Sequence, residues 1–155
     1  MPKKVILVRH GQAEDRSSLV PDGQRRLTTE GLEAIERAYP AYFCDVAGQG
    51  EEVTVLASAA LRTMQTARVV CRVLGVDEDD IVNLGALTNQ NAEWVINDIF
   101  SRDGVVVAVG HSPSIDEVAS ELSGRLRMMA CGEALCLDAE GRYRRMPVLW
   151  DCTPR

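Results

Sequence analysis

The sequence lacks the segments and the cysteine patterns that would indicate a membrane protein, a zinc protein or a redox protein. Its longest apolar runs span only a few residues, whereas a membrane-spanning helix needs about 20. The five cysteines are odd in number and show no C-x-x-C pattern, so we expect reduced, structural thiols. Lys3 and Lys4 precede an apolar run that Arg9 and His10 end too soon for a signal peptide. We therefore expect a cytoplasmic protein with no membrane partner.

Internal repeats, low-complexity tracts and interdomain linkers are also absent, which favours a single domain over residues 1–155. Basic residues are too few for general nucleic-acid binding, since 17 Lys and Arg face 23 Asp and Glu, for a net charge of −6. Such binding needs a basic surface, so no nucleic-acid partner is expected. An anionic substrate is not excluded, because a local cluster of arginines can oppose the overall sign.

Only two histidines are present, and each lies one residue beyond the end of an apolar run. His10 follows residues 5–8, and His111 follows residues 105–109. Runs that are rich in β-branched residues and do not alternate with polar ones predict strands covered on both faces. Each imidazole is therefore expected at the end of a buried strand.

Segments with helical spacing alternate with the strand candidates. The first is expected to begin at Thr28 or Thr29 and to kink or stop near Tyr39, because Pro40 does not fit a helix interior. Ser58 and Ser112 are predicted to cap two later helices. The expected elements are strands at 5–8, 53–57, 81–84 and 105–109, and helices at 29–39, 58–74, 89–100 and 113–123.

This alternation predicts an α/β fold, a three-layer αβα sandwich around a mostly parallel sheet. Residues 129–137 and 143–149 flank a turn and predict a C-terminal β-hairpin, with Pro147 near an edge. Ligands of such sheets bind beyond the carboxyl ends of the strands. His10, Arg62 and His111 all follow such ends, so we expect them to form one site.

The residue types at this site suit a phosphoryl group. Arg9 and Arg62 offer forked N–H donors to its oxygens. Gly11 allows close backbone approach, and a helix beginning at Ser112 would present backbone N–H groups and its positive dipole end. A neutral histidine can attack phosphorus to form a phosphohistidine that water hydrolyses. A second histidine would donate a hydrogen bond to a phosphoryl oxygen and stabilise the developing charge.

Four sequence blocks occur in order through most of residues 5–122. They are V-I-L-V-R-H-G, L-T-T-E-G, L-A-S-A-A-L-R-T-M-Q-T-A and V-V-V-A-V-G-H-S-P. Together they resemble the histidine phosphatase superfamily, also called phosphoglycerate mutase-like. The small size, the R-R-L-T-T-E-G block and the expected C-terminal hairpin look most like the SixA-type bacterial phosphohistidine phosphatases.

The resemblance implies roles for individual residues. His10 would be the phosphoryl acceptor, and Arg9, Arg62 and His111 would complete the catalytic pocket. Arg25 or Arg26 would match a further arginine that reaches the phosphate, and we choose Arg25. Gly11 and Ser112 are further candidates for phosphate binding. No metal or cofactor is implied.

The implied activity is removal of phosphate from phosphohistidine on a protein. The nearest alternative is a phosphatase of small phosphoesters, whose partner would be a small phosphorylated substrate. A second alternative is a non-catalytic module that binds a phosphorylated ligand. The usual signature of such a module is loss of the nucleophile or of an arginine, and neither is lost in this sequence.

One departure from the resemblance concerns the general acid. Many superfamily members carry an acidic residue after the third strand, and the SixA-type pattern has a glutamate where this sequence has Ala86. The nearby carboxylates Glu14, Asp15 and Glu93 do not match that position. An alkoxide is a poor leaving group and needs a proton, because alcohols are about as weakly acidic as water, whose pKa is about 15.7. Imidazole, with a pKa of about 6.5, can leave already protonated, which favours phosphohistidine over sugar phosphates.

Overall fold

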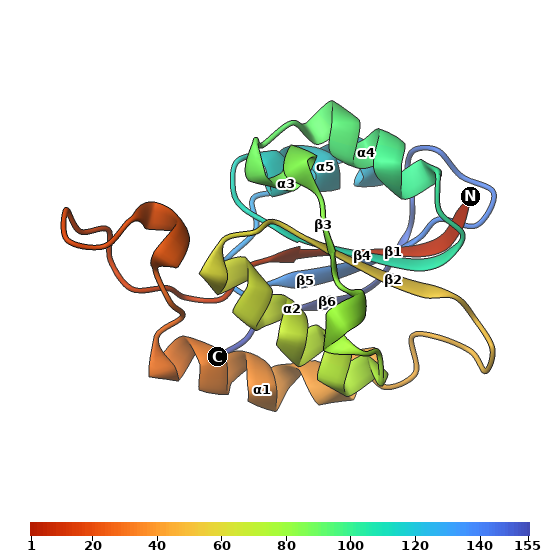
Figure 1. Cartoon of the computed structure of the whole chain (residues 1–155). Coiled ribbons are helices and arrows are strands. Elements are labelled where there is room, and N and C mark those ends of the chain that lie inside the picture. Colours follow the sequence, from red (N-terminus) through yellow and green to blue (C-terminus); the bar gives the residue numbers. More distant parts are fainter.

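One mixed sheet of six strands separates two layers of helices (Figure 1). The computed structural model describes all residues from 1 to 155. Its elements are β1 (Pro2–Arg9), η1 (Asp22–Gln24), α1 (Thr29–Phe43), β2 (Val53–Ala57), α2 (Leu61–Leu74), η2 (Glu78–Asp80), β3 (Val82–Asn83), α3 (Gly85–Thr88), α4 (Ala92–Phe100), β4 (Gly104–Gly110), α5 (Ser114–Ser123), β5 (Ala134–Asp138) and β6 (Val148–Cys152).

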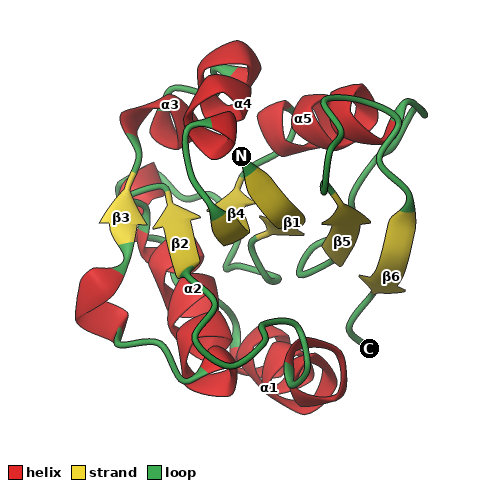
Figure 2. Cartoon of the chain, turned by 90° about the vertical axis from the view of Figure 1, so that its right-hand side faces the viewer, coloured by secondary structure: helices red, strands yellow, loops and turns green.

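The strand order is β3-β2-β4-β1-β5-β6. Strands β1 to β4 pair in parallel, whereas β5 is antiparallel to both β1 and β6. Viewed along the strands, α1 and α2 cover one face of the sheet, and α3, α4 and α5 cover the other (Figure 2). The predicted three-layer fold with a C-terminal hairpin is therefore confirmed. No helix is both long and apolar enough to cross a membrane.

The central strand β4 divides its side chains between two apolar cores, and all seven of its residues are buried. Val105, Val107 and Val109 pack in the core beneath α1 and α2. Val106 and Ala108 pack in the opposite core beneath α4 and α5. Successive side chains of a strand point to opposite faces, so a run without polar residues is what a doubly covered strand requires.

The register between β1 and β4 brings the two histidines together. Arg9 pairs with Gly110 at the ends of the two parallel strands. The next residues are His10 and His111, and the backbone N–H of His10 donates to the carbonyl of Gly110 at 3.1 Å. The imidazole rings lie edge to face, with their centroids 5.3 Å apart.

The prediction that the first helix stops near Tyr39 is wrong, because α1 continues past Pro40 to Phe43. The alternative, a kink at Pro40, stays a prediction. A proline inside a helix costs about 3 kcal/mol or more. Pro40 is exposed, whereas Tyr39 and Phe43 are fully buried. Burying an aromatic ring of 150–250 Å² at about 25 cal/mol per Å² gives roughly 4–6 kcal/mol. Two buried rings therefore outweigh the proline.

Two predicted helix caps are also wrong. Helix α2 begins at Leu61 after Ala60, and α5 begins at Ser114 after Pro113, so neither Ser58 nor Ser112 caps a helix. Thr28 does cap α1, since its hydroxyl accepts from the N–H of Gly31. Smaller shifts affect the predicted helix at 89–100, which is α4 preceded by the short α3, and the hairpin strands, which are β5 and β6.

Gly31 permits a close contact between α1 and the segment that follows His10. A Cβ at this position would collide with the carbonyl oxygen of Gln12 and lie 3.0 Å from the Thr28 hydroxyl. We predict that Gly31→Ala lowers the free energy of unfolding by about 1–3 kcal/mol, because backbone must shift to admit the methyl group. Urea unfolding measures the change. Gly23→Ala is the control, since no atom lies within 4 Å of its added Cβ, and an equal loss in both variants contradicts the prediction.

Candidate active site

A cavity of about 700 Å³ lies where the carboxyl ends of the parallel strands meet. The sequence-predicted residues that line it are Arg9, His10, Arg25, Arg62, His111 and Ser112. Arg26 does not line it, nor does Gly11. The N–H of Gly11 instead donates to the Thr66 hydroxyl at 3.1 Å. The structure therefore brings together the predicted site residues except Gly11.

His10 is held with one ring nitrogen free. Its Nδ1 lies 2.8 Å from the carbonyl oxygen of Gly11. A carbonyl only accepts, so Nδ1 carries the proton and Nε2 is the bare nitrogen. Burial of the ring lowers the pKa of His10 to about 4, and the charges of Arg62 and Arg9 act in the same direction. His10 is therefore neutral near pH 7 and has the unprotonated nitrogen that a nucleophile needs.

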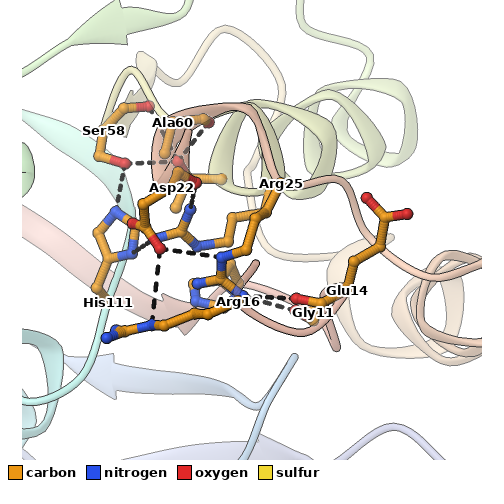
Figure 3. Close-up of polar contacts among 11 residues, drawn as sticks. Gly11, Glu14, Arg16, Asp22, Arg25, Ser58, Ala60 and His111 are labelled. Carbon is orange, nitrogen blue, oxygen red and sulfur yellow. Dashed lines mark hydrogen bonds and ion pairs between the residues drawn. The ribbon is translucent and has the colours of Figure 1, made fainter. Parts of the chain in front are cut away.

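The two polar contacts of the His111 ring (Figure 3) place its proton on the opposite nitrogen. Its Nδ1 lies 3.3 Å from Nη2 of Arg62, and its Nε2 lies 2.7 Å from Oγ of Ser58. A guanidinium only donates, so Nδ1 accepts and Nε2 carries the proton. Burial lowers the pKa of His111 to about 4, as do the charges of Arg62 and His10. The neutral ring therefore presents an acceptor to Arg62.

Three buried polar atoms lack a hydrogen-bond partner, and all three belong to residues that line the cavity. They are Nε of Arg9, Nε of Arg62 and Oγ of Ser112. An unpaired buried donor costs about 1–3 kcal/mol. The rest of each guanidinium is partly occupied, since Arg9 Nη1 donates to the carbonyl of Met129 at 2.8 Å. The residues that carry these atoms line one cavity, and their guanidinium groups suit an anion with several oxygens.

Asp22 is, together with Arg16, a charged cavity residue that sequence reasoning missed. It lies in η1 and reaches the arginines of the cavity (Figure 3). Its carboxylate accepts from Arg62 Nη2 at 3.0 Å and from Arg25 Nε at 2.9 Å, and Arg16 Nε lies 3.7 Å away. Its backbone carbonyl accepts from Arg62 Nη1 at 2.7 Å. Asp22 therefore orients two of the guanidinium groups on the cavity.

The pKa of Asp22 responds to opposing effects. Its slight burial favours the neutral acid, but the hydrogen bonds and charges of Arg25 and Arg62 outweigh this effect and lower the pKa below its usual value. The sequence signal was slight, because Asp22 lies in a polar loop. The only signal in the sequence is its position three residues before Arg25, a spacing at which the carboxylate can reach the Arg25 guanidinium.

The segment expected to supply a general acid contacts the cavity through other residues. Ala86 does not line the cavity, but Thr88 and Gln90 do. Among the alternative carboxylates, Asp15 lines it, whereas Glu14 and Glu93 do not. The carboxylates on the cavity are thus Asp15 and Asp22. No group of three or more His, Cys, Asp or Glu side chains is gathered to hold a metal ion.

The lowered histidine pKa values predict a dependence of stability on pH. In the unfolded chain both imidazoles titrate near 6.5, whereas in the folded chain they titrate at about 4. Between these values the unfolded state binds more protons, so the free energy of unfolding falls as pH drops from 6.5 towards 4. Denaturant unfolding at several pH values measures this fall. A His10→Asn/His111→Asn double variant should show a shallower fall, and parallel curves contradict the prediction.

Known proteins resemble this chain in fold at low sequence identity. No protein-family model and no curated protein sequence matches it. The SixA protein from Agrobacterium tumefaciens is 21% identical, with 99% of each chain covered and a TM-score of 0.82. The protein histidine phosphatase SixA in complex with tungstate is 22% identical, with 97% of each chain covered and a TM-score of 0.69.

A more distant structure widens the set of activities on this fold. The mycobacterial glucosyl-3-phosphoglycerate phosphatase is 13% identical, with 95% of this chain and 97% of that chain covered and a TM-score of 0.63. The fold that the sequence blocks predicted is confirmed by these similarities. The chain has the fold of the histidine phosphatase superfamily, the phosphoglycerate mutase-like fold.

Proposed function

We propose that the chain is a member of the histidine phosphatase superfamily, a single cytoplasmic domain that removes phosphate from phosphohistidine on a protein. One observation carries this proposal. The bare Nε2 of His10 belongs to a cavity on which the buried Nε atoms of Arg9 and Arg62 have no partner. A nucleophile that shares a cavity with unpaired cationic donors suits attack on a phosphoryl group.

In the first step, Nε2 of His10 forms a bond to phosphorus while the bond from phosphorus to the leaving imidazole breaks. Arg9, Arg62 and Ser112, which line the cavity, donate to the phosphoryl oxygens. The carbonyl of Gly11 holds the Nδ1–H of His10 and stabilises the positive charge that develops on its ring. In the second step, water attacks phosphorus while the bond from phosphorus to Nε2 of His10 breaks. The phosphoryl group leaves as inorganic phosphate with the protons of the water, and His10 returns as the neutral imidazole that keeps its proton on Nδ1.

The state of the carboxylates favours an N–P substrate. Asp22 is paired with arginines and its pKa is lowered, so it is a weak source of protons. Ala86 supplies none. An alkoxide needs a proton from a positioned acid, whereas an imidazole leaves from an N–P bond already protonated. Phosphohistidine is therefore the substrate that this site is best equipped to cleave.

A phosphatase of small phosphoesters is the second candidate, and Asp15 favours it. This exposed carboxylate lines the cavity and is free of the ion pairs that hold Asp22. Protonated, it would assist an alcohol leaving group. The non-catalytic alternative gains no such support, because the nucleophile and the arginines of the cavity are all in place.

The leaving-group argument makes a prediction about substrates. We expect the rate to fall in the order phosphohistidine on a phosphotransfer domain, p-nitrophenyl phosphate, glucose 6-phosphate, because the leaving group becomes a stronger base along this series. Steady-state kcat/KM for the three substrates measures it. Asp15→Asn should leave the first substrate nearly unaffected. Comparable kcat/KM for the phosphoprotein and the sugar phosphate would refute the assignment.

The covalent step predicts a labelled intermediate. Brief incubation with a ³²P-labelled phosphohistidine protein, followed by quenching, should leave acid-labile, base-stable label on the wild-type chain, as expected of an N–P bond. His10→Ala should carry no label, since the nucleophile is gone. Arg26→Ala is the matched control and should label normally, because Arg26 does not line the cavity. Label that persists on His10→Ala sinks the mechanism.

A further inference from the structure

A pair of buried hydroxyl groups lies behind His111 (Figure 3). Ser58 and Thr63 are both fully buried. The Ser58 hydroxyl is hydrogen-bonded to Thr63 Oγ1 and lies 2.7 Å from Nε2 of His111. Thr63 Oγ1 also lies 2.7 Å from the carbonyl oxygen of Ala60 and 3.1 Å from that of Ser58. A continuous chain of hydrogen bonds thus runs from the backbone to the ring.

The direction of this chain follows from its two ends. Carbonyl oxygens only accept, so the Thr63 hydroxyl donates its single hydrogen bond to the backbone. Ser58 must then donate to Thr63, and its oxygen faces His111 as an acceptor. Arg62 only donates, which requires His111 Nδ1 to accept and its Nε2 to carry the proton. Both ends independently place the proton of His111 on Nε2.

We propose that Ser58, oriented by Thr63, is the positioning residue for His111. The hydroxyl pair fixes the plane of the ring, keeps Nε2 on the buried side and leaves Nδ1 on the side of Arg62 and the phosphoryl group. This inference rests on the proposed function for its catalytic meaning, but the arrangement of protons is a property of the protein alone.

The arrangement changes the expected role of His111. Its Nδ1 is bare, so the neutral ring donates no hydrogen bond from that atom. When an anionic phosphoryl group binds, its charge favours uptake of a solvent proton at Nδ1, which then donates to a phosphoryl oxygen. The titratable or charged groups around this ring are Arg62, Arg25, Asp22 and the neutral His10. Ser58 continues to accept from Nε2–H, so both N–H groups of the imidazolium have partners.

Histidine NMR tests the proton placement directly, because the chain has only two histidines. In ¹⁵N-labelled wild type at pH 7, we expect His10 protonated on Nδ1 and His111 protonated on Nε2, with a slowly exchanging Nε2–H. Thr63→Val releases the Ser58 hydroxyl to donate, so His111 should gain the Nδ1–H form. Thr63→Ser should restore the wild-type spectrum. Unchanged spectra in Thr63→Val and Ser58→Ala overturn the proposal.

Kinetics provide the second measurement. Removing the acceptor of a buried N–H costs about 1–3 kcal/mol, so Ser58→Ala should lower kcat roughly 5-fold to 160-fold with a smaller change in KM. Thr63→Ser should stay within about 3-fold of wild type, since it keeps the hydroxyl. Ser120→Ala is the matched control, because its hydroxyl bonds backbone atoms near Arg127, away from the cavity. Wild-type kcat in Ser58→Ala contradicts the proposal.

Binding isotherms supply a readout that is independent of turnover. Titration with tungstate in buffers of different ionisation enthalpy should show proton uptake by the wild type and a smaller uptake by Ser58→Ala. Equal uptake by the two counts against the proposal. If wild type cleaves no phosphorylated substrate but keeps these tautomers and this uptake, the proposed function fails and the role of Ser58 in placing His111 stands. If wild type is active and the Ser58 and Thr63 variants match it, the hydroxyl pair is no positioning device and the proposed function stands.

Discussion

The parallel pairing of β1 with β4 is the contact on which the site depends. Its register aligns Arg9 with Gly110, so the residues after both strand ends emerge side by side. The pairing is held by two apolar cores, because alternate side chains of both strands are buried on opposite faces. A slip of one residue would turn every side chain of a strand to the opposite face. The packing of that strand in both cores would then be lost. The relative position of the two histidines is therefore fixed by the packing of two apolar cores, which extend well beyond the site.

The cavity is rich in positive charge although the chain as a whole is acidic. The net charge is −6, yet four arginines, Arg9, Arg16, Arg25 and Arg62, line a single cavity. Like charges so close repel one another, and the carboxylate of Asp22 offsets three of them. Burial and these cations together keep both imidazoles neutral, which leaves an unprotonated nitrogen on His10. One acidic residue thus makes a cationic cavity compatible with a folded chain.

Much of the fold follows from local patterns in the sequence. The apolar runs that end at His10 and His111 predicted the buried strands, and the order of strands and helices predicted the layers. What failed were boundaries decided by tertiary contacts. Pro40 lies within a helix because neighbouring rings are buried, and Ser58 caps no helix because its hydroxyl faces His111. Periodicity is local, whereas these outcomes depend on residues distant in the sequence.

The candidate site was predictable to a similar depth. Arg9, His10, Arg62 and His111 were identified and do line one cavity. Asp22 was not, because an aspartate in a polar loop is ordinary until the fold brings it against Arg62. Ala86, which stands where the SixA-type pattern has a glutamate, does not line the cavity, whereas Thr88 at the end of α3 does. Sequence reasoning thus located the strand-end residues well and the loop residues poorly.

Tyr39 of α1 connects that helix to the backbone of His10 through two hydrogen bonds. Its hydroxyl donates to the carbonyl of Gly132 at 2.7 Å, and the N–H of Gly132 donates to the carbonyl of His10 at 2.8 Å. Gly132 has a φ of +78°, a conformation that other residues rarely adopt. The Arg-His-Gly tripeptide alone would consequently not keep this backbone geometry in another protein. A designer who transplants it onto another parallel sheet must also carry the glycine turn and the tyrosine that hold its backbone in place.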